Sequence, residues 1–398
     1  MRPTTPEVMG RTVLTATLTR PLARPQGQAA LSRIGLADSN DAANALLDDH
    51  RYCYPASPAD PARTVTVLEP LYPDRLGEDF LGLITPASPD HPDTPHPVPE
   101  AVTDDWAHEA ALRLLIPADA GTRALWTRDA LTVLIETARR WPHIATGQLY
   151  PLLKSHPELA LHAGGTALAT LANFDALDLT VLEAIEPHLP TDRHTDLDVG
   201  AAAITSRLAR HRLTTTHDPV TRARTHDALA VRQSYAGLRN EALAAGENAV
   251  KAWRDLARTT PAHRPDLADS LSNLGVWLLE VGRWEEALAV AEEAVGLYRR
   301  LVVGNPAAYE PNLATSLSAW AWVRYAAQQD LSGALRATGE AVEIHRRLVA
   351  MAPALFLSPL CGVLSLQAEL LIRLGHLEEA TEILSWLAAH EAIVDSQS

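Results

Sequence analysis

Hydrophobic residues recur with a helical spacing through most of the chain after residue 103. Leu131, Leu134 and Ile135, with Leu125 before them, fall on one face of a predicted helix. Before residue 217 the pattern predicts helices over 104–115, 121–140, 148–154, 157–172, 178–186 and 196–211. No comparable alternation of the kind that strands show appears in this part of the sequence. We therefore expect layers of helices and not a parallel α/β sheet.

Residues 1–84 have a more mixed pattern. Short helical runs at 28–35 and 41–49 precede the stretch 63–68, where valines alternate with threonines as in a strand. Two helices followed by a strand fit a small winged-helix-like unit. Six prolines then fall between residues 85 and 100, and proline disfavours helix in the residue before it, so 85–103 is expected to be an extended linker.

The C-terminal part repeats itself with a period of about 46 residues. A small residue marks one position in each of four units: Ala242, Ala287, Ala334 and Ala380. A turn glycine stands five residues earlier in three of them: Gly237, Gly282 and Gly375. In the remaining unit Asp330-Leu331 replaces that glycine, and a proline closes each of the first three units at Pro261, Pro306 and Pro353.

These residue types have a common physical reason. Two antiparallel helices approach closely only where their side chains are small, and glycine adopts the positive φ of a tight turn at little cost. A proline ends the second helix. One helix pair cannot bury its apolar stripe alone, so consecutive pairs are expected to stack into a solenoid.

The repeat resembles the tetratricopeptide repeat. The Leu-Gly, turn, aromatic and two alanine positions of that family correspond here to Leu274-Gly275, Gly282, Trp284, Ala287 and Ala294. The period is longer than the usual 34 residues of that family, as in repeats of the kinesin-light-chain type. The resemblance implies an all-α, right-handed α-α superhelix with four repeats over 217–398, preceded by irregular helical repeats over 104–216.

The resemblance also implies a concave groove that binds a peptide or protein. Its lining comes from fixed positions on the first helix of each pair, which are here Arg224, Asp227, Val231, Asp269, Ser272, Asn273, Val276, Glu280, Trp322, Tyr325, Glu369 and Arg373. An amide such as Asn273 can hold a peptide backbone, and Trp322 and Tyr325 offer an apolar docking surface. Ser272 and Val276 occupy the slots of the lysine clamp for terminal carboxylates, so an internal segment or a protein surface is the expected ligand.

A second resemblance covers part of residues 46–80. Leu46 to Pro55, followed by Leu68 to Phe80 with Pro73-Asp74-Arg75-Leu76-x-Glu78, is similar to the region after the ATPase module in actinobacterial signal-transduction ATPases of the STAND class. It implies that 1–84 is a relay segment and that the repeats are a sensor. No GxxxxGK[ST] motif occurs, so nucleotide binding is not carried over, and an ATPase module would act in cis upstream or in trans.

Net charge, apolar runs and cysteine spacing argue against several classes of function. The net charge of -15, from 49 acidic and 34 basic residues, argues against a general nucleic-acid binder. No apolar run long enough to span a bilayer is evident, which predicts no membrane partner. Cys53 and Cys361 are too far apart in sequence to form a disulfide framework or a CxxC metal pair. The stretch from Val13 to Leu18 is too short for a secretory signal, so a cytoplasmic location is expected.

Candidate chemistry is sparse. His50 and Cys53 form an HxxC pair, which a structural pair at a helix end explains without chemistry. Asp74 and Glu78 share a predicted helix face, and helix capping with an ion pair between Arg75 and Asp79 explains them without chemistry. We expect no metal, no cofactor and no catalysis, and thus a non-catalytic protein-interaction scaffold that serves as the sensor part of a signalling protein.

Two other functions remain open. One is a hydrolase with an unannounced site within 104–216, which would need residues such as His156, His188 and Asp198 to meet in a polar pocket. The other is a transcriptional regulator that binds DNA through 1–84. A basic stripe there would favour it, formed by Arg2, Arg11, Arg20, Arg24 and Arg33.

Overall fold

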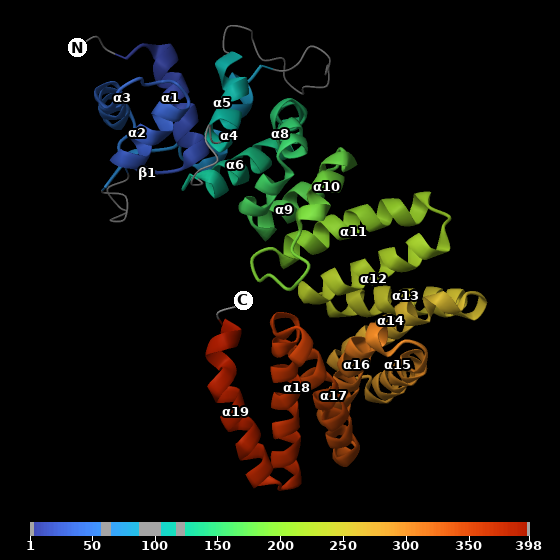
Figure 1. Ribbon diagram of the computed structural model, residues 1–398. Coiled ribbons are helices and arrows are strands. Elements are labelled where there is room, and N and C mark those ends of the chain that lie inside the picture. Colours follow the sequence, from blue (N-terminus) through green and yellow to red (C-terminus); the bar gives the residue numbers. More distant parts are fainter. Residues whose placement is uncertain (1–3, 57–64, 87–104, 117–123, 396–398) are drawn as a thin grey trace. The chain divides into compact units, whose positions relative to one another are not determined.

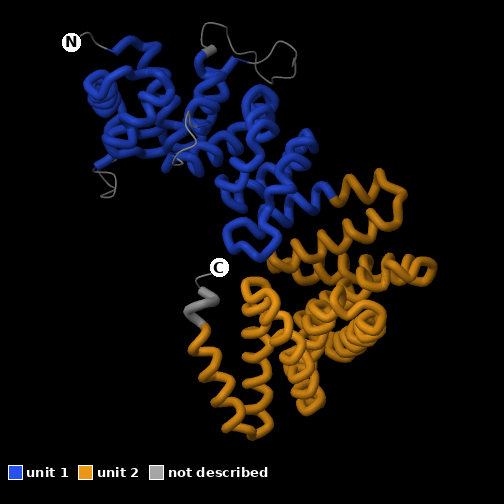
Figure 2. The backbone as a smooth tube through the Cα atoms, in the orientation of Figure 1, with its two compact units in different colours: residues 1–208 blue, residues 209–398 orange. Residues whose placement is uncertain are grey.

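The computed structural model describes residues 4–56, 65–86, 105–116 and 124–395. Backbone contacts divide the chain into two compact units, Met1–Leu208 and Ala209–Ser398 (Figure 2). We call them unit 1 and unit 2. The boundary falls inside one long helix, α11 (Asp198–Thr215).

Unit 1 consists of short helices and one pair of short strands (Figure 1). Its first half contains α1 (Pro6–Thr19), β1 (Leu22–Ala23), α2 (Arg24–Arg33), α3 (Asn40–Cys53), β2 (Thr66–Leu68) and α4 (Asp74–Ile84). Its second half contains α5 (Asp105–Leu115), α6 (Thr127–Arg140), α7 (Pro142–Ile144), α8 (Tyr150–Ser155), α9 (Gly165–Ala172) and α10 (Leu179–Ile185). The strand expected over 63–68 is β2, which pairs antiparallel with β1.

Helix α1 lies at the centre of unit 1 and was not predicted from the sequence. Its residues from Thr12 to Thr19 are all buried, and the helix contacts α2, α3, α4, α5 and α6. Four threonine hydroxyls in this stretch each donate a hydrogen bond to the carbonyl four residues earlier. Threonine is a poor helix former, but these bonds satisfy its hydroxyl and allow it to be buried.

One hydrophobic core spans unit 1. It joins Leu14 and Leu47 of the first half with Leu131 and Leu208 of the second half. The expected linker 85–103 lies almost entirely outside the described residues, but the segments on either side of it share this core. One detail of the sequence analysis is wrong: Leu125 precedes α6 and is exposed.

Unit 2 is a stack of antiparallel helix pairs, which confirms the predicted all-α solenoid of tetratricopeptide type (Figure 1). Each helix packs against the helices before and after it in the chain. The pairs are α12 (Pro219–Tyr235) with α13 (Arg239–Thr259), α14 (Arg264–Glu280) with α15 (Trp284–Gly304), α16 (Pro306–Ala326) with α17 (Leu331–Met351), and α18 (Pro353–Leu374) with α19 (Leu377–Asp395).

Small residues hold these pairs together as the sequence predicted. Ala287 and Ala334 are fully buried, and a Cβ atom added at Gly275 would lie 3.4 Å from the Ala287 carbonyl oxygen. The turn glycine Gly282 has a φ of 80°, which favours glycine. Asp330, which replaces that glycine in the third pair, adopts a φ of 40° and accepts a hydrogen bond from the backbone N–H of Gly333 to cap α17.

The first helices of the pairs line the inner side of this stack. Helix α16 contacts both α14 and α18 directly, in addition to its own partner α17. In a curved stack the helices on the inner side approach one another most closely. The groove that the repeat pattern predicted therefore lies across α14, α16 and α18.

Helix α18 corrects the expectation that no apolar run of the sequence is long enough to span a bilayer. It is long and apolar enough to cross a membrane by length and composition, with a mean hydropathy of 1.8 over 18 residues. A single helix of this kind is weak evidence for a membrane span, because core helices share the composition. Leu360, Val363 and Leu364 of α18 are buried in the core of unit 2, so the hydropathy of this helix has a packing explanation.

Candidate binding groove on the repeat unit

Two adjoining depressions mark the inner side of unit 2. The first, between α14 and α16, has a volume of about 240 Å³ and is lined by Asp269, Ser272, Asn273, Pro311, Asn312, Thr315 and Ser316. The second, between α16 and α18, has a volume of about 430 Å³ and is lined by Thr315, Ser318, Ala319, Trp322, Gly362, Val363, Ser365, Leu366 and Glu369. We call them the polar depression and the apolar depression. Thr315 lines both, so the two depressions adjoin at this residue, and we call them together the groove.

Hydrogen bonds organise the polar depression. The Asp269 carboxylate accepts from the Tyr298 hydroxyl at 2.5 Å and from the Asn312 amide at 3.4 Å. Asp269 opens onto the groove, yet the surrounding protein still desolvates its carboxyl and raises its pKa, an effect that the two hydrogen bonds oppose. The Ser272 and Ser316 hydroxyls lie 2.9 Å apart. The exposed Asn273 amide lies beside them at the surface.

The apolar depression has an aromatic wall and a floor of small residues. The Trp322 side chain is 43% exposed, and its ring lies 5.8 Å from that of Tyr325. A Cβ atom added at Gly362 would meet nothing within 4 Å, so the floor is open at this point. The Tyr325 hydroxyl bonds to Glu369, which raises the pKa of the tyrosine, and the Arg373 guanidinium lies 5.4 Å from the Tyr325 ring centroid.

The groove residues occupy the same four helical positions in successive repeats. On α14 these are Asp269, Ser272 and Asn273, with Val276 at the fourth position but outside both depressions; on α16, Thr315, Ser318, Ala319 and Trp322; on α18, Gly362, Ser365, Leu366 and Glu369. We call this set the groove stripe. Its spacing of three, four and seven residues puts the four positions of each helix on one face.

The structure separates the predicted groove residues into three groups. Asn273, Trp322 and Glu369 line the two depressions, and Asp269 and Ser272 do so as well. Tyr325 and Arg373 adjoin the apolar depression through the contacts given above. The remaining positions lie on α12 and α14 outside both depressions: Arg224, Asp227, Val231, Val276 and Glu280.

Asp227 has a structural role in the stack. Its carboxylate accepts hydrogen bonds from the Trp253 indole and from the Ser270 hydroxyl, and so joins α12, α13 and α14. Desolvation raises the pKa of this carboxyl. Asp269 does the same for α14, α15 and α16 through Tyr298 and Asn312. Each carboxylate thus ties one helix pair to the next.

The sequence analysis missed several groove residues. Thr315, Ser318 and Ala319 on α16, and Gly362 and Leu366 on α18, were not named. A signal for them was available, because adding the repeat spacing to Asp269, Ser272, Asn273 and Val276 leads to these positions. Small and neutral side chains do not attract attention unless the register of the repeat is followed.

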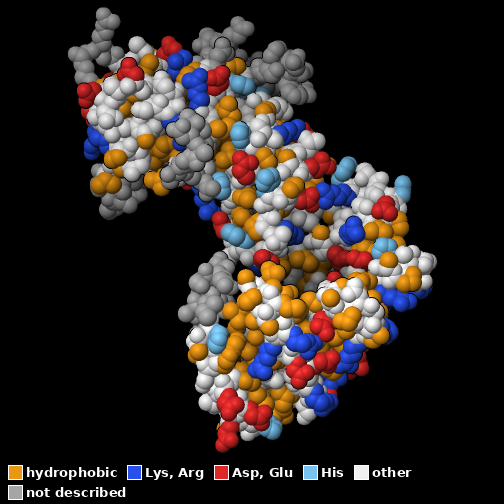
Figure 3. Space-filling view, viewed as in Figure 1, with side chains coloured by type: hydrophobic (Ala, Val, Ile, Leu, Met, Phe, Trp, Pro, Cys, Tyr) orange, Lys and Arg blue, Asp and Glu red, His pale blue; other side chains and the backbone are white. Residues whose placement is uncertain are grey.

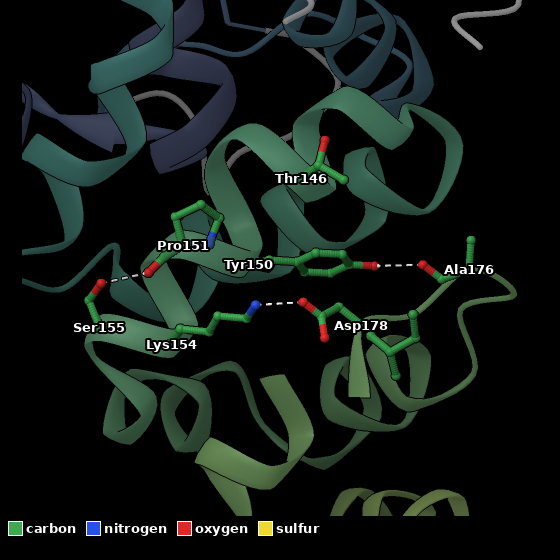
Figure 4. A pocket seen from close by; sticks show the side chains of 8 residues that line it. Thr146, Tyr150, Pro151, Lys154, Ser155, Ala176 and Asp178 are labelled. Atoms are coloured by element: carbon green, nitrogen blue, oxygen red, sulfur yellow. Dashed lines mark hydrogen bonds and ion pairs between the residues drawn. The ribbon is translucent and has the colours of Figure 1, made fainter. Parts of the chain in front are cut away.

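Unit 1 contains a pocket of about 630 Å³ whose polar groups are already engaged (Figure 4). The Lys154 ammonium pairs with Asp178 at 2.5 Å, and Asp178 also accepts from the backbone N–H of Thr180 to cap α10. The Tyr150 hydroxyl donates to the Ala176 carbonyl at 3.4 Å, and burial raises its pKa. These contacts tie α8 to the start of α10.

The residues named for a hydrolase do not meet. His156 follows α8 and lies 3.6 Å from Glu158, whereas His188 is exposed on a 3-10 turn. Asp198 is buried and accepts from the backbone N–H of His194, as a residue at a helix start does. None of the three lines the pocket in Figure 4.

His50 and Cys53, which form the HxxC pair, also lie in different surroundings. The His50 ring is buried with Nε2 at 2.9 Å from the Glu69 carbonyl oxygen, and desolvation lowers its pKa. Cys53 is exposed. Over the described ranges, no group of three His, Cys, Asp or Glu side chains could hold a metal ion.

The acidic residues at the start of α4 serve packing. Asp74 accepts two hydrogen bonds from Arg20. Glu78 and Asp79 both pair with Arg140 of α6, so the expected ion pair between Arg75 and Asp79 is wrong. These bonds fix α4 against α1 and α6.

The N-terminal arginines are engaged within unit 1. Arg11 pairs with Glu7 and Arg24 with Asp48, while Arg20 binds Asp74. Arg33 donates to the Arg113 carbonyl. Arg2 lies outside the described residues. These contacts disfavour the basic stripe that a DNA-binding function would need.

A comparison with known families agrees with the repeat assignment. Residues 267–306 match the family model described as tetratricopeptide repeat, which covers α14 and α15 and supports a protein-interaction scaffold in general terms. Among solved structures, BtubC (BKLC) from P. vanneervenii is similar at 15% sequence identity and a TM-score of 0.42, over 68% of this chain and 91% of that chain. No curated protein matches the sequence.

Proposed function

We propose that unit 2 binds a polypeptide along the groove stripe. The observation that carries this proposal is the repetition of four helical positions on three consecutive first helices, which produces two depressions joined at Thr315. The exposed Trp322 ring offers apolar contact area, and the Asn273 amide can pair with a peptide backbone. An elongated groove of this kind fits a chain that crosses several helices.

We further propose that the protein is a non-catalytic scaffold. Support comes from the engaged polar groups of the unit 1 pocket and from the separation of His156, His188 and Asp198. The chemistry that the groove offers is hydrogen bonding and apolar contact. Within the groove, Asp269 and Glu369 both accept hydrogen bonds from tyrosines.

The resemblance of 46–80 to the relay of a STAND-class ATPase supports a more specific proposal, in which the repeats are the sensor of a cytoplasmic signalling protein. The segment spans α3, β2 and α4, and its Asp74 and Glu78 are bound by Arg20 and Arg140. An ATPase module would act in cis or in trans. A pull-down with a purified ATPase of that class tests this proposal separately from peptide binding.

A matched pair of variants tests peptide binding. Thr315→Arg places a long charged side chain where the two depressions join. Thr381→Arg makes the same change on α19, away from the groove. Both threonines are exposed, and each donates its hydroxyl to the carbonyl four residues earlier, so the two changes have similar local consequences for the helix.

The assay is selection of a phage-displayed random peptide library on the full chain. Peptides enriched on the wild-type chain should bind the Thr381→Arg variant equally well and lose about tenfold or more in affinity for Thr315→Arg. Circular dichroism of both variants should match the wild type. Equal affinity for Thr315→Arg would overturn the proposed function.

A further inference from the structure

Two carboxylates of the groove lie outside the ion pairs of unit 2. Asp269 and Glu369, which line the two depressions, form no ion pair among the described residues. The contacts of Asp269 are with the neutral Tyr298 and Asn312, and Glu369 accepts from the neutral Tyr325 hydroxyl. Carboxylates that are held only by neutral hydrogen-bond donors attract a positively charged ligand.

The outer helices of unit 2 show a different arrangement. Glu293 of α15 pairs with Arg254 of α13 at 2.5 Å, and one repeat later Glu340 of α17 pairs with Arg299 of α15 at 2.6 Å. The face of unit 2 in Figure 3 shows acidic and basic side chains next to one another. Arginine therefore neutralises these outer carboxylates, whereas Asp269 and Glu369 in the groove accept hydrogen bonds from neutral side chains.

Among the described residues, neither arginine of the predicted groove forms an ion pair with Asp269 or Glu369. Arg224 lies on α12, outside both. Arg373 lies one turn beyond Glu369 on α18 and stacks over the Tyr325 ring. The Arg373 guanidinium also hydrogen-bonds the Tyr325 hydroxyl that binds Glu369, but the two charged side chains form no direct ion pair.

The helix spacing fixes a distance along the ligand. Packed helices lie about 9 Å apart, and an extended chain advances about 3.3 Å per residue, so about three ligand residues correspond to one helix spacing. Asp269 on α14 and Glu369 on α18 are separated by two such spacings across the helices and by seven positions, about 10 Å, along them, so that about six extended residues span the distance. The apolar depression, with Trp322 and Leu366, lies between α16 and α18.

From this geometry, and resting on the proposed function, we propose that the groove binds an extended cationic segment of a partner protein. An apolar side chain of that segment fills the depression beside Trp322. Two basic side chains, about six residues apart with the apolar residue between them, reach Asp269 and Glu369. The partner is thus defined by charge and spacing, and the segment is internal to its chain.

The sequences of the selected peptides test this inference. We expect lysine or arginine at positions about six residues apart with an apolar residue between them, and an affinity that falls as salt rises. Selection on Glu369→Lys should replace one basic position by an acidic one, whereas selection on the exposed Glu343→Lys of α17 should leave the pattern unchanged.

Affinity measurements on one selected peptide complete the test. Glu369→Gln should weaken binding by about threefold to tenfold, and Glu343→Gln should not. Peptides that depend on Thr315 but are acidic, or show no basic spacing, would overturn this inference and leave the proposed function standing. If no enriched peptide depends on Thr315, both fail.

Discussion

The two units of this chain are both helical, but they are built on different principles. In unit 1 the helices from α1 to α10 have at most 14 residues, and a central helix is buried over eight consecutive positions. In unit 2 the helices have 17 to 22 residues, and each packs on its neighbours in sequence. Unit 1 depends on particular side chains, whereas unit 2 reuses the same positions from repeat to repeat.

This difference explains why the groove lies in unit 2. A repeated stack presents equivalent positions side by side, so small residues at those positions produce a continuous surface. In unit 1 the polar groups that a pocket would need, such as Tyr150 and Lys154, are used to join helices. Four substitutions test this difference between the two units.

The largest effect is expected from Leu14→Ala in α1. Leu14 is fully buried at the centre of unit 1, and truncation of such a leucine costs about 3–5 kcal/mol. Hydrogen exchange measured by mass spectrometry should show loss of protection in unit 1 peptides and much less in peptides from α14 to α19. Equal loss throughout would contradict separate cores.

A smaller effect is expected from Gly246→Ala on α13. A Cβ atom there would lie 2.4 Å from the Trp277 ring of α14, so overpacking between these two consecutive helix pairs should cost about 1–3 kcal/mol. Gly362→Ala on α18 is the matched control, because its Cβ meets nothing within 4 Å and alanine favours a helix by about 1 kcal/mol. Thermal unfolding that ranks the two variants the other way would refute this packing account.

The bonds between helix pairs can be tested with Tyr298→Phe. The variant removes the hydroxyl that donates to Asp269, and the expected loss of unfolding free energy is about 1–2 kcal/mol. Tyr325→Phe, on the surface beside the groove, should cost less than about 0.5 kcal/mol. Chemical denaturation measures both, and equal losses would show that the Asp269 link does not stabilise the stack.

The smallest effect is expected on the outer helices. Arg254→Gln removes the ion pair with Glu293, in which both side chains are about two-fifths exposed. Exposed pairs contribute about 0.2–1 kcal/mol, so the midpoint of denaturation should hardly move. A loss as large as that of Gly246→Ala would mean that surface charges, and not small residues, hold the repeats together.

The sequence predicted unit 2 much better than unit 1. The recurring alanines and turn glycines of unit 2 report a backbone requirement that any sequence with this fold must meet. Helix α1 was missed because its alternating threonines weaken a helical pattern, and their burial depends on hydrogen bonds that only the folded helix reveals. The interhelix pairing of Asp79 with Arg140 is likewise a tertiary contact that sequence spacing does not predict.

Only part of the groove was predicted, because only some of its side chains stand out in the sequence. Asn273, Trp322 and Glu369 were identified because polar or aromatic residues stand out at the repeat positions. Thr315 and Gly362, which shape the depressions, have small side chains and were found only in the structure. Asp227 was expected in the groove, and its bonds to Trp253 and Ser270 show that it joins repeats.

The most direct test of the groove is the hydrogen exchange of the full chain with and without a library-selected peptide. Peptide binding should slow exchange in the three segments that hold the groove stripe, 269–276, 315–322 and 362–369, and leave α15, α17 and unit 1 unchanged. Protection confined to the outer helices or to unit 1 would contradict the account.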